Sequence, residues 1–565
     1  MMMFGKHYNF STVRQYLFSA RFLFIYMVLA IAIPNFTLAF TNPIPLFANV
    51  VSTILPLAFY VWLMALSHKT GRQVWLLFPL VFFAAFQMVL VYLYGGGAIA
   101  VDMFLNLATT NPDEALELLD NLIPAVTGVV VLYIPLLVLA AWQWKKKTLL
   151  NTDFQHRMRR LSLRIGGGML LLTALLYAVY PQGEERSGRF EYHVENNVYP
   201  VNVFYNLGLA IHESWLSDHY QERVAHFKFG ARATHHTDST EVYVLVVGET
   251  ARSRNFQLYG YARPTNPELS RESRLMVFKN VRSQSNTTHK SVPMLLTAAR
   301  ADDHSRLYDE KGILAAFGEA GFHTAFFSNQ LRNHSYIDFL GEQADKACFI
   351  REKQSSLRPD DEQLLAYVTQ ELDKHPRKLF IVLHMYGSHF NYRDRYSRAN
   401  ARFLPDEPTE AKVENRSQLI NAYDNTILHT DRILARLIGI LRARHCISAM
   451  LYTSDHGENI FDDKRHLFLH ASPRPSEYDT DVPLLLWTSK QFDQQYPDIV
   501  SALHGNLNKG VESNASVFPT MLSIAGIRAR ACDDRLSLTN RSYRLGKRYY
   551  LDDHNHAVLL STFFK

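Results

Sequence analysis

Residues 453–458 read Thr453-Ser454-Asp455-His456-Gly457-Glu458, and they follow the apolar run Ile447–Tyr452. This run predicts a buried strand that ends just before Asp455 and His456. In open α/β sheets, ligands lie at the carboxyl ends of the strands. A carboxylate and an imidazole side by side at such an end can act together as metal ligands. The stretch therefore predicts an α/β fold and one part of a metal site.

Two further apolar strands end at residues of the same kind. Val242–Val247 is followed by Glu249, and Leu379–Leu383 runs into His384 and then His389. One such strand end would be weak evidence. Three of them predict a metallohydrolase-like site at the sheet edge where the strands end.

Strands and helices alternate along the C-terminal part of the chain. This order predicts a mostly parallel sheet sandwiched by helices. The expected strands are Val242–Val247, Thr324–Ser328, Leu379–Leu383, Ala449–Thr453 and Val482–Trp487. The expected helices include Lys311–Glu319, Asp360–Leu372 and Ser417–Arg442. The segment Arg393–Arg416 is rich in Pro, Arg and Asn and is expected to be an exposed loop.

The N-terminal part of the chain is predicted to lie in a membrane. With 565 residues, the chain exceeds what one hydrophobic core organises. Five apolar runs are each near the ~20 residues that span a bilayer, and the last is the shortest. They are Phe22–Phe40, Leu46–Leu66, Val74–Tyr94, Leu122–Trp142 and Ile165–Tyr180. A five-helix transmembrane domain is therefore expected.

Basic residues predict the orientation of these spans. They precede the first span and fill the second and fourth connections, whereas the connections at 41–45 and 101–121 contain no Lys or Arg. Under the positive-inside rule, the N-terminus is cytoplasmic and everything after about residue 181 lies outside. A cleaved signal peptide is the alternative for the first run, but Pro34 and Asn35 interrupt it and no clear cleavage site follows.

Three regions follow from this division of the chain. Residues 1–181 form the transmembrane domain, 182–238 a linker with interfacial helices, and 239–565 the catalytic α/β domain. The aromatic-rich stretch 190–229 predicts one or two helices that lie on the membrane surface or pack on the soluble domain. The sequence leaves both arrangements open.

Charge and cysteine content exclude some functions. The formal net charge of +6 is modest and partly belongs to the cytoplasmic loops, so no nucleic-acid partner is expected. The three cysteines are Cys348, Cys446 and Cys532. They allow one disulfide at most, and a Cys348–Cys532 pair is left open.

A nucleophile is expected in the segment Asn286–Leu296, where a polar turn precedes a helix start. Thr287, Thr288 and Ser291 offer hydroxyl groups there, and the first backbone N–H groups of a helix favour developing negative charge. A zinc ion lowers the pKa of a bound oxygen and so activates such a hydroxyl. An ordinary threonine N-cap is the alternative.

A second polar group lies in the connection between the third and fourth spans. Asn106, Thr110 and Glu114 recur every four residues and would share one helix face. Pro112 fits only if the helix begins or bends there. A carboxylate with amide and hydroxyl neighbours suits an ammonium group and its phosphate. A solvated acidic loop is the alternative, since further acidic residues lie nearby.

Several motifs together resemble the bacterial envelope phosphoethanolamine transferases of the alkaline-phosphatase/sulfatase superfamily. They are Gly248-Glu249-Thr250, 259–267 (Tyr-Gly-Tyr-Ala-Arg-Pro-Thr-Asn-Pro), 288–293 (Thr-His-Lys-Ser-Val-Pro), 383–389 (Leu-His-Met-Tyr-Gly-Ser-His) and Ser454-Asp455-His456-Gly457-Glu458. These enzymes modify lipid A or lipopolysaccharide core sugars and include colistin-resistance enzymes. The resemblance covers the whole chain and implies a multi-pass inner-membrane protein with a periplasmic catalytic domain.

The resemblance implies roles for single residues. Thr288 matches the nucleophile that becomes phosphoethanolamine-substituted, and the spacing to Ser-Val-Pro selects it over Thr287. Glu249, Asp455 and His456 match the protein ligands that hold one Zn²⁺ against Thr288. His389 and His470 match a pair that binds the substrate phosphate or a second zinc. Asn106, Thr110 and Glu114 match contacts to the phosphatidylethanolamine head group.

The implied reaction is a two-step transfer from phosphatidylethanolamine to lipid A or the core oligosaccharide, by a monomer embedded among membrane lipids. Gln284 and Met294 stand where lipid A-modifying members often have cysteines, so the acceptor is left open. A phosphoglycerol transferase and a catalytically inactive membrane sensor are the alternatives. Glu114 argues against the first, because glycerol has no ammonium group. The complete set Glu249, Thr288, Asp455 and His456 argues against the second. A sulfatase is disfavoured because the Cys-x-Pro-x-Arg pattern is missing from the nucleophile segment.

Overall fold

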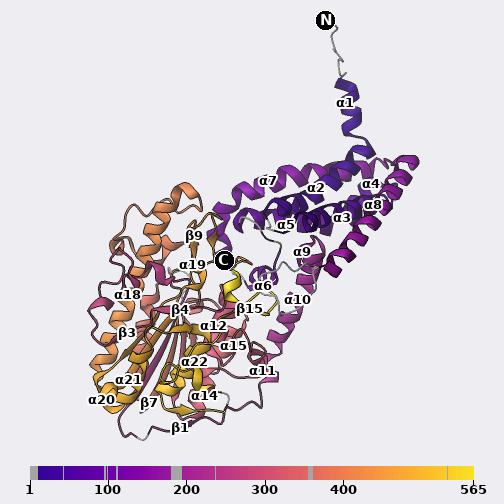
Figure 1. Ribbon diagram of the computed structural model, residues 1–565. Coiled ribbons are helices and arrows are strands. Elements are labelled where there is room, and N and C mark those ends of the chain that lie inside the picture. The colour runs from indigo at the N-terminus through magenta and orange to yellow at the C-terminus, as the bar shows by residue number, and fades with distance from the viewer. Residues whose placement is uncertain are drawn as a thin grey trace. The chain divides into compact units, whose positions relative to one another are not determined.

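The computed structural model describes residues 10–41, 44–94, 97, 99–109, 112–179, 194–235, 237–353, 360–530 and 532–564 (Figure 1). The chain divides into two compact units. Unit 1 comprises Met1–Ala100 and Leu119–Leu209, and unit 2 comprises Val101–Leu118 and Ala210–Lys565. Each unit is described by itself. The predicted domain limits at 181 and 238 remain a prediction.

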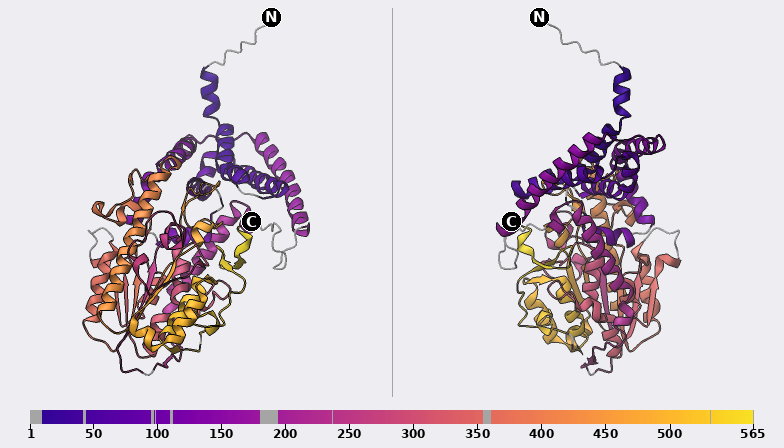
Figure 2. Two further views of the ribbon diagram at one scale, coloured as in Figure 1. Left: turned by 60° about the vertical axis from the view of Figure 1, so that its left-hand side comes forward. Right: turned by 90° about the vertical axis from the view of Figure 1, so that its right-hand side faces the viewer.

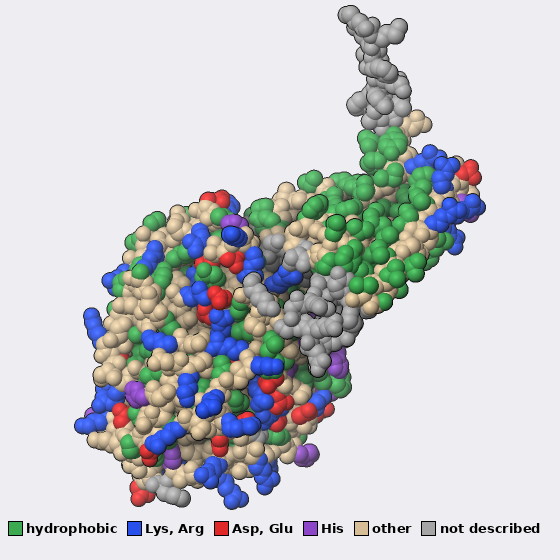
Figure 3. Space-filling model, in the orientation of Figure 1, with side chains coloured by type: hydrophobic (Ala, Val, Ile, Leu, Met, Phe, Trp, Pro, Cys, Tyr) green, Lys and Arg blue, Asp and Glu red, His purple; other side chains and the backbone are tan. Residues whose placement is uncertain are grey.

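Unit 1 is helical. Its long elements are α2 (Ala20–Thr41), α3 (Leu46–Met64), α5 (Phe78–Tyr94), the part of α7 (Pro112–Lys145) after residue 118, and α8 (Thr152–Val179). The shorter ones are α1 (Phe10–Leu17), α4 (Thr70–Leu76), α9 (Val194–Asn197) and the first half of α10 (Val201–Asp218). On the face shown in Figure 3, hydrophobic side chains cover the long helices. Such an exterior suits a lipid environment rather than water.

The membrane prediction is supported for up to four of the five runs. Among the described residues, α2, α3 and the segment Leu122–Lys145 of α7 are long and apolar enough to cross a bilayer. A fourth span results if α4 and Phe78–Tyr92, which are bent by 61° relative to each other, count as one. The fifth predicted run, Ile165–Tyr180, is helical as the second half of α8 but is not among these candidates.

Unit 2 is built on a seven-stranded sheet with the order β3-β11-β8-β2-β7-β5-β6. The strands are β2 (Glu241–Gly248), β3 (Leu275–Val277), β5 (His323–Ser328), β6 (Lys346–Phe349), β7 (Lys378–His384), β8 (Ile447–Ser454) and β11 (Leu484–Thr488). β11 pairs antiparallel with both of its neighbours, β3 and β8, and all the other pairs in this sheet are parallel. All five predicted strands are present within two residues at either end, and the expected mostly parallel sheet is confirmed.

Helices cover both faces of the sheet, as Figures 1 and 2 show. Alternate residues of β2 explain this, since Tyr243, Leu245 and Val247 enter one core while Val242, Val244 and Val246 enter the other. The first core also contains α12 (Thr288–Leu296), α14 (Ile313–Glu319) and α22 (Ser513–Ile524). The second contains α17 (Leu364–Leu372) and α18 (Arg416–Ala443). The fold is thus the expected sheet sandwiched by helices.

Smaller elements complete unit 2. The remaining helices are α6 (Val101–Thr109), α11 (Tyr220–Arg223), α13 (Arg306–Asp309), α15 (Tyr336–Gly341), α16 (Ile350–Lys353), α19 (Glu477–Thr480), α20 (Lys490–Gln495) and α21 (Pro497–Asn506). The small strands are β1 (Arg232–Ala233), β4 (Asn280–Arg282), β9 (Asn459–Ile460), β10 (Phe468–Leu469), β12 (Gly510–Glu512), β13 (Ile527–Arg528), β14 (Tyr549–Leu551) and β15 (Ala557–Leu559). The second half of α10 belongs to this unit, where Glu213 accepts a hydrogen bond from Tyr308 and Trp215 stays half exposed.

Candidate active site

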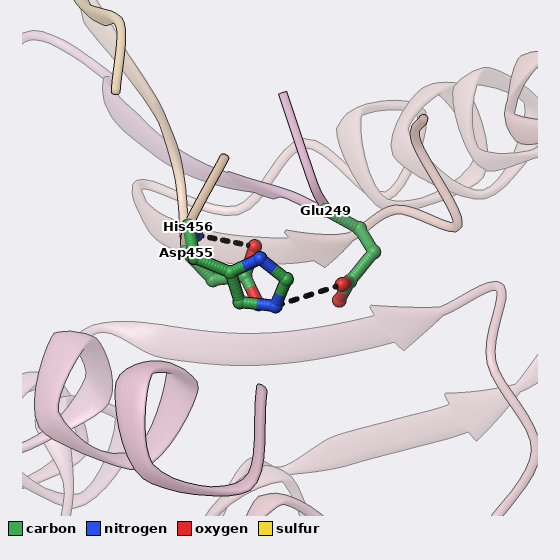
Figure 4. Close-up of side chains that lie close together, drawn as sticks. All are labelled: Glu249, Asp455 and His456. Atoms are coloured by element: carbon green, nitrogen blue, oxygen red, sulfur yellow. Dashed lines mark hydrogen bonds and ion pairs between the residues drawn. The ribbon is translucent and has the colours of Figure 1, made fainter. Parts of the chain in front are cut away.

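Adjacent strands bring three of the predicted ligands together. In the parallel register of β2 and β8, Gly248 pairs with Ser454, so Glu249 and Asp455 leave the sheet side by side. One ligand atom from each of Glu249, Asp455 and His456 lies within 4.8 Å of the other two. His456 Nε2 is 3.4 Å from Glu249 Oε1 and 3.2 Å from Asp455 Oδ2. Figure 4 shows Glu249 facing the imidazole of His456.

The hydrogen bonds of Asp455 and His456 engage one polar atom of each side chain and leave the other facing the cluster. Asp455 Oδ1 accepts the backbone N–H groups of Thr250 (3.0 Å) and His456 (2.7 Å). Asp455 Oδ2 is buried and has no hydrogen-bond partner among the described residues. His456 Nδ1 lies 2.9 Å from the carbonyl oxygen of Gly457, which fixes the tautomer with a lone pair on Nε2. Two carboxylates and one imidazole in this state form a donor set that fits zinc.

Thr288 joins this group as the first residue of α12. Its Oγ1 lies 3.0 Å from Glu249 Oε1 and 3.1 Å from His456 Nε2. The neighbouring Thr287 instead places its hydroxyl 3.2 Å from Ser285 Oγ. Of the hydroxyl groups of Thr287 and Thr288, therefore, the one on Thr288 contacts the carboxylate–imidazole cluster and the one on Thr287 does not.

Burial shifts the pKa values of all three side chains in this cluster toward their uncharged forms. Desolvation and, after it, the negative charge of Asp455 raise the pKa of Glu249 to about 8. Desolvation also raises the pKa of Asp455 to about 7. Burial lowers the pKa of His456 to about 4, so the imidazole is neutral. A divalent cation would relieve the repulsion between the two carboxylates.

His389 and His470, the pair expected to bind the substrate phosphate or a second zinc, lie near this cluster. The His470 ring centroid lies 4.2 Å from that of His456 and 6.1 Å from that of His389. His470 Nδ1 is 3.3 Å from Glu458 Oε1, and His389 Nδ1 is 2.7 Å from the carbonyl oxygen of Phe390. Each Nδ1 thus faces an acceptor and carries the proton, which leaves Nε2 for another partner. Burial lowers the pKa of His470 to about 4 and that of His389 well below its usual range.

The predicted head-group residues do not share one continuous helix. Asn106 lies on α6, which ends at Thr109, while Glu114 lies on α7, which begins at Pro112. Proline favours a first helical position, which explains the break. Thr110 lies outside the described residues, and the Glu114 side chain is not described. Their role remains a prediction.

Three contacts to the site were not predicted from the sequence. Gln330 follows β5 and donates a hydrogen bond to Glu249 Oε2 (3.2 Å), so the rule applied to the other strand ends could have found it. Glu458 is the last residue of the motif at 454–458, and it contacts His470. Asp102 of α6 binds Lys290 Nζ (2.8 Å) and His289 Nε2 (3.2 Å) of α12. Burial opposes its ionisation, but these two neighbours hold the pKa of Asp102 at about 2.

The geometry places a threonine hydroxyl against a group of two carboxylates and an imidazole that could hold a metal ion. Residues 241–527, half of the chain, match the family described as Sulfatase. The chain belongs to this family. The expected resemblance to the alkaline-phosphatase/sulfatase superfamily is therefore confirmed.

Similar proteins with assigned names make the resemblance more specific than the family match alone. The chain is 26% identical over 523 residues to phosphoethanolamine transferase EptA of Salmonella typhimurium, covering 87% of this chain and 89% of the relative. It is 30% identical over 311 residues to the Kdo(2)-lipid A phosphoethanolamine 7''-transferase of Escherichia coli K12, covering 53% and 54%. The second alignment thus spans about half of either protein. The expectation of an enzyme of this group is confirmed by the family match and the names of these relatives.

Solved structures confirm the fold. The integral membrane protein lipooligosaccharide phosphoethanolamine transferase A of Neisseria meningitidis matches with a TM-score of 0.72 at 20% identity, covering 92% of this chain and 97% of that one. The periplasmic domain of Escherichia coli EptC in complex with Zn matches with a TM-score of 0.53 at 24% identity, covering 59% and 96%. The combination of N-terminal membrane helices and a sulfatase-like α/β unit is thus found in a known structure.

Proposed function

We propose that the protein transfers phosphoethanolamine from phosphatidylethanolamine to an envelope glycolipid, either lipid A or the lipopolysaccharide core. The contact of Thr288 Oγ1 with Glu249 Oε1 (3.0 Å) and His456 Nε2 (3.1 Å) carries the proposal. A hydroxyl held between a buried carboxylate and an imidazole is arranged as a nucleophile. The names of the relatives supply the transferred group and the acceptor class.

Zinc is the proposed cofactor. Glu249, Asp455 and His456, with Thr288, would hold one ion, and His389 with His470 would hold a second ion or the substrate phosphate. The partnerless Asp455 Oδ2 and the Nε2 lone pair of His456 support the first site. When bound, zinc lowers the pKa of the Thr288 hydroxyl and offsets the charge of the phosphoryl oxygens.

In the first step, Thr288 Oγ attacks the phosphorus of the donor, and the bond from phosphorus to the diacylglycerol oxygen breaks. Glu249 Oε1, 3.0 Å from Thr288 Oγ1, takes the hydroxyl proton, which ends on diacylglycerol. In the second step, an acceptor hydroxyl or phosphate oxygen attacks the same phosphorus, the bond from phosphorus to Thr288 Oγ breaks, and the proton of the acceptor goes to Thr288 Oγ. Burial keeps His389 and His470 neutral, but the negative charge of an arriving phosphodiester would raise the pKa of both, and each would then donate Nε2–H to a phosphoryl oxygen.

The remaining assignments belong to the same proposal. The protein is a monomer in the bacterial inner membrane, with a cytoplasmic N-terminus and a periplasmic catalytic domain. The basic residues at one end of unit 1 support this orientation. Asn106, Thr110 and Glu114 bind the ethanolamine head group of the donor, because a carboxylate suits its ammonium.

A pair of variants tests the function. Thr288→Ala removes the nucleophile, so mass spectrometry of the lipid A and core fractions should show no added phosphoethanolamine. Thr287→Ala, which removes a neighbouring hydroxyl that contacts Ser285, should retain clear activity. The fraction that gains the mass in cells with the wild-type protein identifies the acceptor. A dead Thr287→Ala beside an active Thr288→Ala would reject the assignment, and an added phosphoglycerol would establish the alternative donor.

A further inference from the structure

A cavity of about 740 Å³ lies among the helices of unit 1. It is lined by α4, the end of α7 and the turn that follows α7. Its basic side chains are Lys69, Arg72 and Lys147, and its aromatic side chains are Trp75 and Trp144. We call it the basic pocket. Its volume is within the range of roughly 300–1,000 Å³ that is usual for ligand sites.

Close packing and hydrogen bonds build the walls of the basic pocket. A Cβ at Gly71 would lie 2.4 Å from the carbonyl oxygen of Ala140, so only glycine lets α4 approach α7 this closely. Thr70 Oγ1 donates to Gln143 Oε1 (2.9 Å), which ties the same two helices together. Both side chains are buried. The pocket is therefore a fixed feature of the helix packing.

Lys147 occupies a backbone position that normally belongs to glycine. Its φ is +54°, in the left-handed region, at the turn that ends α7. The N–H of Thr148 donates to the carbonyl oxygen of Gln143 (3.1 Å), as in the common glycine-terminated helix end. A lysine here has a conformational cost that glycine would avoid. Its charge in the pocket offers a reason for keeping it.

The positive charges of the basic pocket have no acidic counterpart nearby in the sequence. The chain contains no Asp or Glu before Asp102, and none from residue 121 to residue 152. All the lining residues fall in these two acid-free stretches. The next acidic residue is Asp153, which is exposed at the start of α8. Figure 3 shows Lys and Arg side chains gathered at the end of unit 1 where α4 and α8 are labelled in Figure 1.

We propose that the basic pocket binds the phosphodiester head group of an anionic phospholipid, such as phosphatidylglycerol or cardiolipin. Within the part of the chain that the structure describes, these three cations make no ion pair with a carboxylate, and such a group of cations suits a phosphate. Trp75 and Trp144 are 37% and 52% exposed, as expected of tryptophans in the interfacial region of a bilayer. The zwitterionic donor of the proposed reaction would bring an ammonium group into this cluster of cations. The pocket therefore discriminates against the donor and is a separate lipid site.

Native mass spectrometry of the full-length protein tests the proposal. The protein is released from nanodiscs that contain equal parts of phosphatidylethanolamine, phosphatidylglycerol and cardiolipin. We expect it to retain an anionic lipid at least tenfold more often than phosphatidylethanolamine. The variant Lys69→Gln/Arg72→Gln/Lys147→Gln should lose this preference. The variant Arg157→Gln/Arg159→Gln/Arg160→Gln loses the same charge from the exposed surface of α8 and should keep it.

A second measurement needs no charge variant and covers the case that the triple variant fails to insert. Brominated phosphatidylglycerol should quench the fluorescence of the wild-type protein more than brominated phosphatidylethanolamine does. Replacing Trp75 and Trp144 by Phe should remove this difference, and millimolar inorganic phosphate should leave it unchanged. Equal retention of all lipids, or equal loss of the preference in both charge variants, would overturn the proposal. So would equal quenching by the two brominated lipids.

Discussion

Single side chains decide how the carboxylate of Glu249 faces Thr288. Glu249 Oε1 accepts hydrogen bonds from Thr250 Oγ1 (2.8 Å) and Thr288 Oγ1 (3.0 Å), while Oε2 accepts one from Gln330 (3.2 Å). Gln330 also donates to the carbonyl oxygen of Met385 (3.0 Å). Partners of this kind hold a metal ligand in its productive orientation. In the proposed metal site, Gln330 is therefore a positioning residue for Glu249.

Replacing Gln330 by alanine should weaken transfer and leave the nucleophile in place. Loss of such a partner typically costs about 10- to 100-fold in activity or metal affinity. We expect a fall of this size in the transfer rate, together with faster loss of zinc to a chelator. The matched control, Gln418→Ala on α18, should keep wild-type activity and zinc retention. Normal zinc kinetics in the Gln330 variant would contradict the positioning role.

Gly387 packs directly against the backbone of Glu249. Its φ is +56°, and a Cβ there would lie 2.6 Å from the carbonyl oxygen and 2.8 Å from the nitrogen of Glu249. Alanine must therefore displace Glu249, so we expect Gly387→Ala to lower both zinc content and transfer more than tenfold. Gly318→Ala, in α14 with open space around it, should change neither and should stabilise its helix by about 0.5–1 kcal/mol. Zinc content is measured by elemental analysis of the purified proteins.

Some site residues follow from the sequence and others do not. Glu249, Asp455 and His456 stand directly behind apolar strands, so a strand-end rule finds them. The pair Asp102–Lys290 joins residues 188 positions apart, one of them in a polar connection between apolar runs. Such a pair depends on how helices α6 and α12 pack, and no local pattern encodes it. The motif at residues 288–293 identifies Thr288 from the sequence. Only the structure gives the distances from its hydroxyl to Glu249 and His456.

Elements are predicted best where hydrophobic periodicity is strong and uninterrupted. The buried strands β2, β7 and β8 and the helix α18 match their predicted ranges closely. Around Pro112 the structure shows one of the two arrangements that the proline allows, since α7 begins there, and Asn106 and Glu114 therefore lie on α6 and α7. The loop 393–416 is exposed or partly exposed over most of its length, as expected, but its first residues are buried, since the Arg393 side chain is 8% exposed and pairs with Asp406. Ion pairs between distant loop residues leave no periodic signal.

Asp462 links three elements around the sheet. It pairs with Arg252, in the segment after β2, and with Arg416 at the start of α18 (2.9 Å). Burial alone would raise the pKa of Asp462, but the charge and hydrogen bond of Arg252, the backbone N–H of Ile460 and the charge of Arg416 together lower it below the usual value. The depressed pKa means that the pair stabilises the fold above the unfolded-state pKa of about 3.9. This stability is lost as the pH falls below that value.

Asp462→Asn should therefore destabilise the protein at pH 7 and flatten its acid sensitivity. Breaking a buried ion pair by removing one partner typically costs about 3–5 kcal/mol. The measurement is the thermal unfolding midpoint of the full-length protein in detergent from pH 7 down to pH 3. Asp463→Asn, at the exposed Arg465 pair, should shift stability by less than about 0.5 kcal/mol. Equal midpoints for both variants at pH 7 would contradict the role of Asp462.

The catalytic unit as a whole is stabilised by two hydrophobic cores, one on each face of the sheet. Cys348 and Cys446 lie in the core with α17 and α18, whereas Cys532 packs against the core with α12 and α22. All three cysteines are free. Because the sheet separates Cys348 from Cys532, the disulfide that the sequence left open does not form. The unit is large enough for its cores to stabilise it without a covalent link.

The cysteine-free protein should therefore remain active. Free cysteines in a core act as small apolar groups, so Cys348→Ala/Cys446→Ala/Cys532→Ala removes modest packing but no cross-link. We expect phosphoethanolamine transfer at normal expression to stay within about twofold of the wild type. A reductant that does not chelate zinc should leave the wild-type protein equally active. Loss of most activity in the cysteine-free protein, together with inactivation of the wild type by that reductant, would show that a disulfide orders the site.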